Sequence, residues 1–214
     1  MIRKILFQCL LASSLVAGGS AFAAHKSTAK KETPAAETSA TDGPVRFAPV
    51  VTSGSVGNWS YRCVFKGDSL SAGPQNCLIQ QELAVQQKGQ RPVPLGMVVL
   101  ARAPQSANQA SLADRPWHIA IVAPAGLSLQ KQPQISTDQN APVALSWESC
   151  ANSGCISSAD LTTSQAKEFH LASSGSFVAS RLEGTNDLKI SFSLKGLDKA
   201  MDRVQSWIDH PPFH

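Results

Sequence analysis

The chain has 214 residues, of which 43% are hydrophobic and 6% aromatic, and its formal net charge is +4. This length favours one domain with additional ends, and the hydrophobic fraction is sufficient for an ordinary core. The small number of aromatic residues argues against a platform for stacking bases, and the small positive charge gives little support for a nucleic-acid partner. The composition therefore predicts a small globular protein with no nucleic-acid partner.

The N-terminus has the three parts of a secretory signal peptide, over residues 1–23. Arg3 and Lys4 supply its positive region, an apolar run covers residues 5–17, and Ala21-Phe22-Ala23 fits a cleavage site. The apolar run is shorter than the roughly 20 residues that a membrane span needs. We therefore expect a cleaved signal peptide, a periplasmic or secreted protein, and no transmembrane span in the mature chain.

A polar leader is expected next, over residues 24–50. Its first part, residues 24–44, consists largely of Lys, Thr, Ala, Glu, Ser and Pro, with no large apolar side chain. Such a segment cannot bury enough apolar surface to offset its ordering entropy, so we expect a disordered leader or spacer. Residues 51–210 are predicted to form one domain, and residues 211–214 a C-terminal tail.

Four cysteines follow the signal segment: Cys63, Cys77, Cys150 and Cys155. An even number in an exported chain predicts disulfides, and of the three possible pairings we favour the local ones, Cys63–Cys77 and Cys150–Cys155. Loop entropy gives roughly 3 kcal/mol for the first and somewhat less for the second. A zinc site is the alternative, but zinc sites have short Cys-x2-4-Cys spacings on both sides, and the first pair here is too widely spaced.

Short strands dominate the expected secondary structure. Regular patterning begins at Asn58, after which Trp59, Tyr61, Cys63 and Phe65 alternate with polar residues and should share one face. Further strands are predicted at residues 77–85, 97–101, 117–122, 127–129, 177–179 and 188–194, and polar loops at residues 102–116 and 130–141.

The segment Ser146–Cys155 has a pattern of its own. An apolar run leads into it, and two cysteines enclose the tetrapeptide Ala-Asn-Ser-Gly. We predict a strand, a tight turn clipped by a disulfide, and a strand that leaves. Asn152 and Gly154 are both able to take a positive φ in such a turn.

Two helices are expected late in the chain. The first covers residues 160–174, with a capping box made by Thr162 and Gln165 and a C-terminal cap at Gly175. The second covers residues 197–208, where four apolar residues at helical spacing form a core-facing stripe: Leu197, Met201, Val204 and Ile208. Many short strands without strand–helix alternation predict an all-β, antiparallel sandwich with one or two short peripheral helices.

Several short motifs, in order over roughly residues 58–205, resemble the invasion-associated locus B family of exported bacterial proteins. They are Trp59-x-Tyr-x-Cys63, Cys77 with Gln80-Gln81, Pro94-Leu95-Gly96-Met97, Pro124-Ala125-Gly126-Leu127-Ser128-Leu129, Cys150-x-x-x-Gly154-Cys155 and Phe192-Ser193-Leu194-Lys195-Gly196-Leu197. The resemblance implies an immunoglobulin-like β-sandwich in the periplasm or at the cell surface. It transfers no catalytic residue, because none is established for the family.

No nucleophile-elbow, zinc-protease or P-loop motif occurs in the chain. We therefore predict no enzymatic activity, no catalytic residue, no cofactor and no metal site. A triad of His118, a serine and Asp114 or Asp160 is conceivable, because triads are defined by geometry and not by sequence order.

Three tryptophans, Trp59, Trp117 and Trp147, are expected in the core rather than in a sugar-stacking row. Three functional classes follow from the sequence. The first is an exported, non-enzymatic protein that binds another macromolecule, either a protein or an envelope component. The second is a glycan- or small-ligand-binding module, and the third is a hydrolase without a recognised motif.

Overall fold

The computed structural model describes residues 48–213 except 86–88, 90, 106–110 and 139–140. The chain divides into two units, residues 1–43 and 44–214, and the account below concerns the second. The predicted signal peptide and most of the predicted leader lie outside the described residues.

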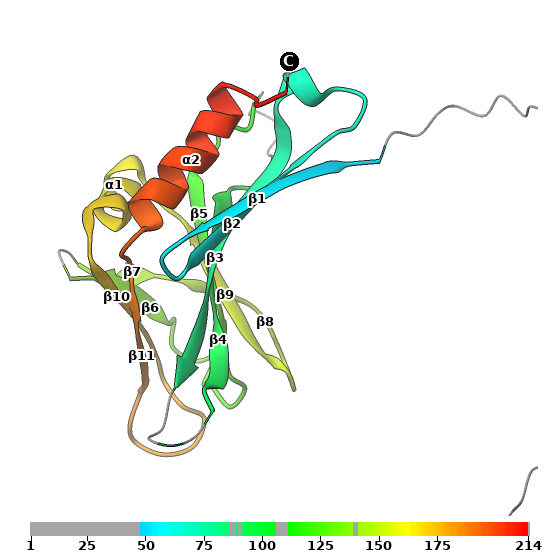
Figure 1. Ribbon diagram of the computed structural model, residues 1–214. Helices are drawn as coiled ribbons and strands as arrows, with labels where there is room; N and C mark the ends of the chain where they lie inside the picture. The colour runs from blue at the N-terminus through cyan, green and yellow to red at the C-terminus, as the bar shows by residue number, and fades with distance from the viewer. Residues whose placement is uncertain (1–47, 86–88, 90, 106–110, 139–140, 214) are drawn as a thin grey trace, which may run out of the picture. The chain divides into compact units, whose positions relative to one another are not determined.

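A seven-stranded antiparallel sheet forms the larger layer of the domain (Figure 1). Its strand order is β1-β2-β3-β4-β5-β9-β8. The strands are β1 (Val50–Val56), β2 (Trp59–Phe65), β3 (Pro74–Val85), β4 (Val93–Arg102), β5 (Trp117–Ala123), β9 (Gly154–Asp160) and β8 (Ser146–Ala151).

A four-stranded antiparallel sheet forms the second layer, with the order β11-β10-β6-β7. Its strands are β11 (Leu188–Ser193), β10 (Ser174–Ala179), β6 (Gln134–Thr137) and β7 (Val143–Ala144). Phe177, Ile135 and Ile190 from this sheet are buried in the same cluster as residues of the larger sheet. The fold is therefore mostly β, a two-sheet sandwich with two helices, as the sequence predicted.

The alternation of apolar and polar residues decides which face of each strand is buried. In β2, Trp59, Cys63 and Phe65 are buried, Tyr61 is half-buried, and the polar residue Arg62 is exposed, as predicted. Because side chains of a strand alternate between its faces, one strand supplies both a core face and an outer face.

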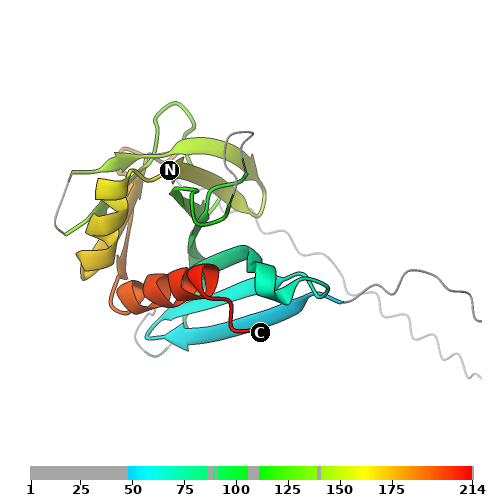
Figure 2. The ribbon, with the colours of Figure 1, turned by 90° about the horizontal axis from the view of Figure 1, so that it is seen from above.

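The helix α2 (Leu197–Asp209) packs against β1, β2 and β3 (Figures 1 and 2). Leu197, Met201 and Val204 are buried along its inner side, which confirms the predicted apolar stripe, and Trp207 lies 5.5 Å from the ring of Tyr61. The helix therefore covers the part of the larger sheet that the four-stranded sheet leaves open.

The shorter helix α1 (Thr163–Leu171) begins with the predicted capping box. The backbone N–H of Gln165 donates to Thr162 Oγ1 at 3.2 Å, and the backbone N–H of Thr162 donates to Gln165 Oε1 at 2.9 Å. A cap of this kind typically contributes about 1 kcal/mol to stability. The predicted cap at Gly175 is wrong, because the helix ends at Leu171.

Gly175 lies inside β10, where a glycine is needed for packing and not to cap a helix. A Cβ at this position would lie 2.7 Å from the ring of Phe192, a buried residue of β11. The glycine therefore makes room for an aromatic ring on the neighbouring strand.

Three other expectations about local structure were wrong. Residues 50–56 form the edge strand β1, although regular patterning was expected only from Asn58. The strand β6 occupies part of the expected loop at residues 130–141. Residues 127–129 form no strand: Leu127 makes an isolated bridge with Arg181, and Leu129 is exposed. The partner of β6 in β10 and the partner of Leu127 are distant in the sequence, so local patterning did not show them. The strand β1 pairs with the adjacent β2, but it consists largely of small and polar residues with little apolar alternation.

In each cysteine pair, the two residues lie directly opposite each other on neighbouring strands. The sulfur atoms of Cys63 and Cys77 are 1.92 Å apart, and those of Cys150 and Cys155 are 2.06 Å apart. The second pair closes the β8–β9 hairpin, which has the predicted strand–turn–strand form. Of the two residues able to take a positive φ in this turn, Gly154 does so, with a φ of 140°, and Asn152 does not.

Among the described residues, no helix is both long and apolar enough to span a membrane. The C-terminal tail is described as far as Phe213, whose ring packs edge-on against that of Phe65 at 5.0 Å. This contact holds the tail to the domain.

Candidate functional site

The residues of the conceivable triad do not come together. His118 Nδ1 lies 2.7 Å from Asp160 Oδ1, where β5 pairs with β9. Asp114 instead accepts a hydrogen bond from Ser111 at 2.6 Å. Ser158, two residues from Asp160, donates to Glu148. Within the described part of the chain, no serine hydrogen-bonds to His118, so a histidine–carboxylate pair is present without a nucleophile.

The tryptophans of the sequence analysis are mostly inside the protein. Trp59 and Trp117 are buried, and Trp147 is half-buried, with its Nε1–H donating to the carbonyl oxygen of Lys131 at 3.0 Å. These positions agree with the predicted core role of Trp59 and Trp117. They do not form an exposed row of the kind that stacks on sugars.

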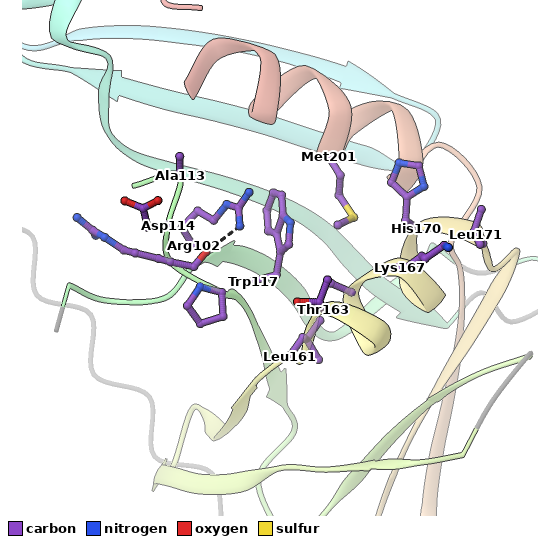
Figure 3. A pocket seen from close by; sticks show the side chains of 13 residues that line it. Arg102, Ala113, Asp114, Trp117, Leu161, Thr163, Lys167, His170, Leu171 and Met201 are labelled. Carbon is purple, nitrogen blue, oxygen red and sulfur yellow. Dashed lines mark hydrogen bonds between the residues drawn. The ribbon is translucent and has the colours of Figure 1, made fainter. Parts of the chain in front are cut away.

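The main candidate site is a cavity of about 780 Å³ that we call the Arg102–Trp117 cavity (Figure 3). Its walls are the end of β4, the start of β5 with the segment before it, α1, and one residue of α2. Its lining includes Arg102, Asp114, Arg115, Trp117, Leu161, Thr163, Ala166, Lys167, His170, Leu171 and Met201. The volume falls in the range of small-ligand sites, roughly 300–1,000 Å³.

Arg102 and Trp117 form the central pair of this cavity. They lie opposite each other in the antiparallel register of β4 and β5. The guanidinium carbon of Arg102 lies 4.3 Å from the centre of the Trp117 ring, a cation–π contact. Nη1 of Arg102 donates to the carbonyl oxygen of Arg115 at 2.7 Å, and Nη2 donates to Gln205 Oε1 on α2. The Arg102 side chain is therefore fixed between two strands and a helix.

Positive charge in the cavity has little direct compensation. Burial lowers the pKa of Arg102, and the charge of Asp209 partly opposes that shift. Neither Arg115 nor Lys167 has an ion-pair partner among the described residues. His170 is different, because its Nε2 lies 2.9 Å from Asp202 Oδ1 and so joins α1 to α2.

The remaining wall is apolar. Trp117, Leu161, Ala166 and Met201 are each less than a tenth exposed, so they form a packed surface with little freedom to move. At the rim, Leu171 is 68% exposed. The cavity therefore combines a fixed cation, Arg102, and an exposed one, Lys167, with an apolar floor.

The sequence pattern did not reveal this site. Residues 102–116 were predicted to form a polar loop, and Trp117 was expected only in the core. The available signal was an arginine directly after an apolar strand and a tryptophan opening the next one. An antiparallel pairing of these two strands brings Arg102 and Trp117 together, but the sequence does not reveal that α1 and α2 complete the walls.

A second cavity, of about 560 Å³, lies beside β3 and β11. Its lining is largely polar and includes Ser60, Gln80, Gln81, Glu82 and Ser191. The Gln81 side chain is 6% exposed, and its Oε1 has no hydrogen-bond partner among the residues that the structure describes. Such a buried acceptor can take a hydrogen bond from a hydroxyl group.

No group of three or more His, Cys, Asp or Glu residues within the described ranges is arranged to hold a metal ion. The four cysteines of the sequence-based zinc alternative lie instead in two separate pairs.

Comparisons with known proteins give a consistent result. The family model described as invasion associated locus B (IalB) protein matches residues 59–205. The crystal structure of invasion associated protein B from Bartonella henselae is similar, with a TM-score of 0.52 and 16% sequence identity over 72% of this chain and 95% of that chain. No curated protein matches the chain.

Proposed function

The chain belongs to the invasion associated locus B family, and from this premise we propose that it is an exported, non-enzymatic protein that binds another macromolecule outside the cytoplasm. The proposed partner is a protein or an envelope component, met in the periplasm or after secretion. At 16% identity the Bartonella henselae structure supports the shared fold alone, so no role in invasion is transferred from it.

Support for export comes from two features. Residues 1–23 carry the pattern of a signal peptide. Two cysteine pairs lie at disulfide distance, and disulfides persist in oxidising compartments outside the cytoplasm.

A binding role agrees better with the side chains than a hydrolytic one. His118 pairs with Asp160 as in a triad, but no serine among the described residues hydrogen-bonds to His118, and Asp114 is hydrogen-bonded to Ser111 instead. The observation that carries the proposal is the Arg102–Trp117 cavity, which offers cations without ion-pair partners over an apolar floor. Such a surface suits an occupant that pairs with the cations and covers the apolar residues.

The glycan-binding alternative depends on the second cavity. The unpartnered Gln81 Oε1 and the neighbouring hydroxyls suit a ligand rich in hydroxyl groups. The cavity lining includes one aromatic residue, Phe192, which is 6% exposed and offers little ring face for stacking on a sugar. We therefore rank this function second.

Site-specific photo-crosslinking in the native cell tests the proposed function. A benzophenone amino acid replaces Leu171 at the rim of the Arg102–Trp117 cavity, and the matched control carries it at Leu182. These two leucines are 68% and 69% exposed. We expect a discrete adduct from the Leu171 position and none from Leu182. Equal adducts, or none, would reject the cavity as the binding surface.

Enzymatic activity is tested separately with ester, peptide and glycoside substrates. We expect no turnover above that of the buffer. Activity that is lost on replacing His118 by alanine would overturn the non-enzymatic assignment and point to the His118–Asp160 pair.

A further inference from the structure

The chemistry of the Arg102–Trp117 cavity narrows the class of its ligand. We propose that the cavity binds a carboxylate joined to an apolar chain or ring, the carboxylate attracted by the positive charge of Arg102 and Lys167 and the apolar part lying on Trp117, Leu161 and Met201. This inference rests on the proposed function, because it takes the cavity as the binding surface.

The charge of the lining favours an anion. Arg102, Arg115 and Lys167 are cationic, whereas Asp114 is the one carboxylate among the lining residues. Positive charge lining a concave surface raises the local concentration of anions and speeds their association. Asp114 also opposes a second negative charge, so a singly charged carboxylate is favoured over a doubly charged phosphate.

Arg102 is positioned to bind a carboxylate. Its two hydrogen-bond acceptors, a backbone carbonyl and the amide oxygen of Gln205, are both neutral, and the charge of Asp209 only partly opposes the effect of burial on its pKa. A half-buried cation without a direct ion-pair partner carries a desolvation cost, and a bound carboxylate would offset part of it. Because Trp117 and Gln205 already hold the guanidinium in place, little entropy is lost when a ligand binds.

Lys167 provides a second cation from another element. It lies on α1 and is exposed. In Figure 3 it lies on the side of Trp117 away from Asp114, near His170. Arg102 lies on the Asp114 side of the Trp117 ring in the same view, so Lys167 adds positive charge from the opposite end of the cavity, away from the one carboxylate of the lining.

The floor accounts for the apolar part of the ligand. Leu161 and Met201 are 2% and 4% exposed and present a packed apolar surface, and Leu171 at the rim is largely exposed. Burying apolar surface contributes roughly 25 cal/mol per Å², so an apolar body adds affinity that a bare anion lacks.

The test uses the isolated full-length mature protein and three eight-carbon probes: octanoate, octan-1-ol and octylammonium. Binding is followed by shifts of the tryptophan indole signals in ¹H–¹⁵N spectra, which Trp117 should dominate. We expect saturable binding of octanoate, at least about tenfold tighter than of octan-1-ol, and weakening as salt increases.

Two matched variants locate the site. Lys167→Gln removes an exposed cation of the cavity, and Lys189→Gln removes an exposed cation of β11 outside the cavity. We expect about threefold weaker octanoate binding for Lys167→Gln, as for an exposed charge pair, and no change for Lys189→Gln. Neither lysine is in the core, so both variants should fold.

A second pair of probes distinguishes the source of the carboxylate. A tetrapeptide ending in leucine is compared with its C-terminally amidated form. Tighter binding of the free peptide than of octanoate assigns the site to a polypeptide C-terminus, and the reverse order assigns it to a small organic acid.

The inference is overturned if octanoate and octan-1-ol bind equally, if neither octanoate nor the free peptide binds, or if Lys189→Gln weakens binding as much as Lys167→Gln. Failure here with a positive Leu171 crosslink would leave the proposed function standing and reject only the ligand class. A negative crosslink with saturable octanoate binding would reject the macromolecular partner at this cavity and leave the ligand class standing.

Discussion

At the scale of single residues, two glycines allow neighbouring strands to approach the end of β5. A Cβ on Gly96 of β4 would lie 1.9 Å from the carbonyl oxygen of Val122, and one on Gly154 of β9 would lie 2.5 Å from that of Ala123. Both obstacles are backbone atoms, which cannot rotate away. Both glycines belong to the motifs on which the family resemblance rests, so packing explains why a glycine stands at these two positions of the motifs.

Replacing Gly96 by alanine should therefore destabilise the domain by about 3 kcal/mol, because the β4–β5 pairing must open to accept the new methyl group. Gly126→Ala is the control, since Gly126 also has a positive φ, of 86°, but nothing lies within 4 Å of its added Cβ. It should cost about 1 kcal/mol from backbone strain alone. Denaturant unfolding measures both, and equal losses would show that the close approach is unimportant.

One carboxylate gives the domain a predictable response to acid. The hydroxyl of Ser173 donates to Asp138 Oδ2 at 2.6 Å, and this hydrogen bond is the main cause that lowers the pKa of Asp138 below its ordinary value of 3.8. A lowered folded-state pKa stabilises the fold above about pH 4, and this contribution is lost as the pH falls through the folded-state value.

Asp138→Asn should therefore be less stable than the native protein at pH 7 and should lose less further stability below pH 4. Ser173→Ala, which removes the donor, should flatten the acid response in the same way. Melting temperatures between pH 7 and pH 2.5 measure the effect. Parallel curves for the native and Asp138→Asn proteins would contradict it.

At the scale of elements, the β8–β9 hairpin is closed by Cys150–Cys155, with Asn152 and Ser153 at its turn. Closing so short a loop stabilises by about 2 kcal/mol on the chain-entropy estimate. Redox pairs are usually Cys-x-x-Cys at a helix N-terminus, whereas this pair joins two strands. We therefore predict a structural role for the bond.

Replacing Cys150 and Cys155 together by serine should lower the melting temperature modestly and leave the fold and partner binding intact. The Cys63–Cys77 bond closes a longer loop, so the matched double replacement of these two cysteines should cost more, about 3 kcal/mol. The reduction potential of Cys150–Cys155 is the decisive measurement. A value above roughly −200 mV, as oxidising as that of disulfide-exchange enzymes, would make this bond functional and labile.

At the scale of the whole molecule, the remaining prediction is export with cleavage near Ala23 or Ala24, motivated by the charged, apolar and small-residue regions of the N-terminus. N-terminal sequencing of protein purified from its own cells measures it. The same material, analysed without reductant, should contain no free thiols, because Cys9 leaves with the signal peptide and the other four cysteines pair. An intact Met1 on cytoplasmic protein would contradict the prediction.

Much of the fold could be predicted because its signals are local. Alternating residues identified β2, and the capping box of Thr162 and Gln165 identified the start of α1. The strand β1 was missed because it is only partly apolar, although it pairs with the adjacent β2. The strand β6 was missed because it is short and pairs with β10, far along the chain. Gly175 was misassigned because its contact, the ring of Phe192, lies on another strand.

The sequence by itself determined the composition of each strand face, the local cysteine pairs and the family. These depend on residue types at short, regular spacings, which the backbone geometry of strands and tight loops converts directly into structure. Tertiary structure alone decided the candidate site. Arg102, Lys167 and Met201 come from a strand and two helices, and their shared cavity exists only because both helices pack beside the end of the larger sheet. The local sequence does not show how segments so far apart in the chain pack together. Neither the cavity nor its charge could therefore be predicted without the fold.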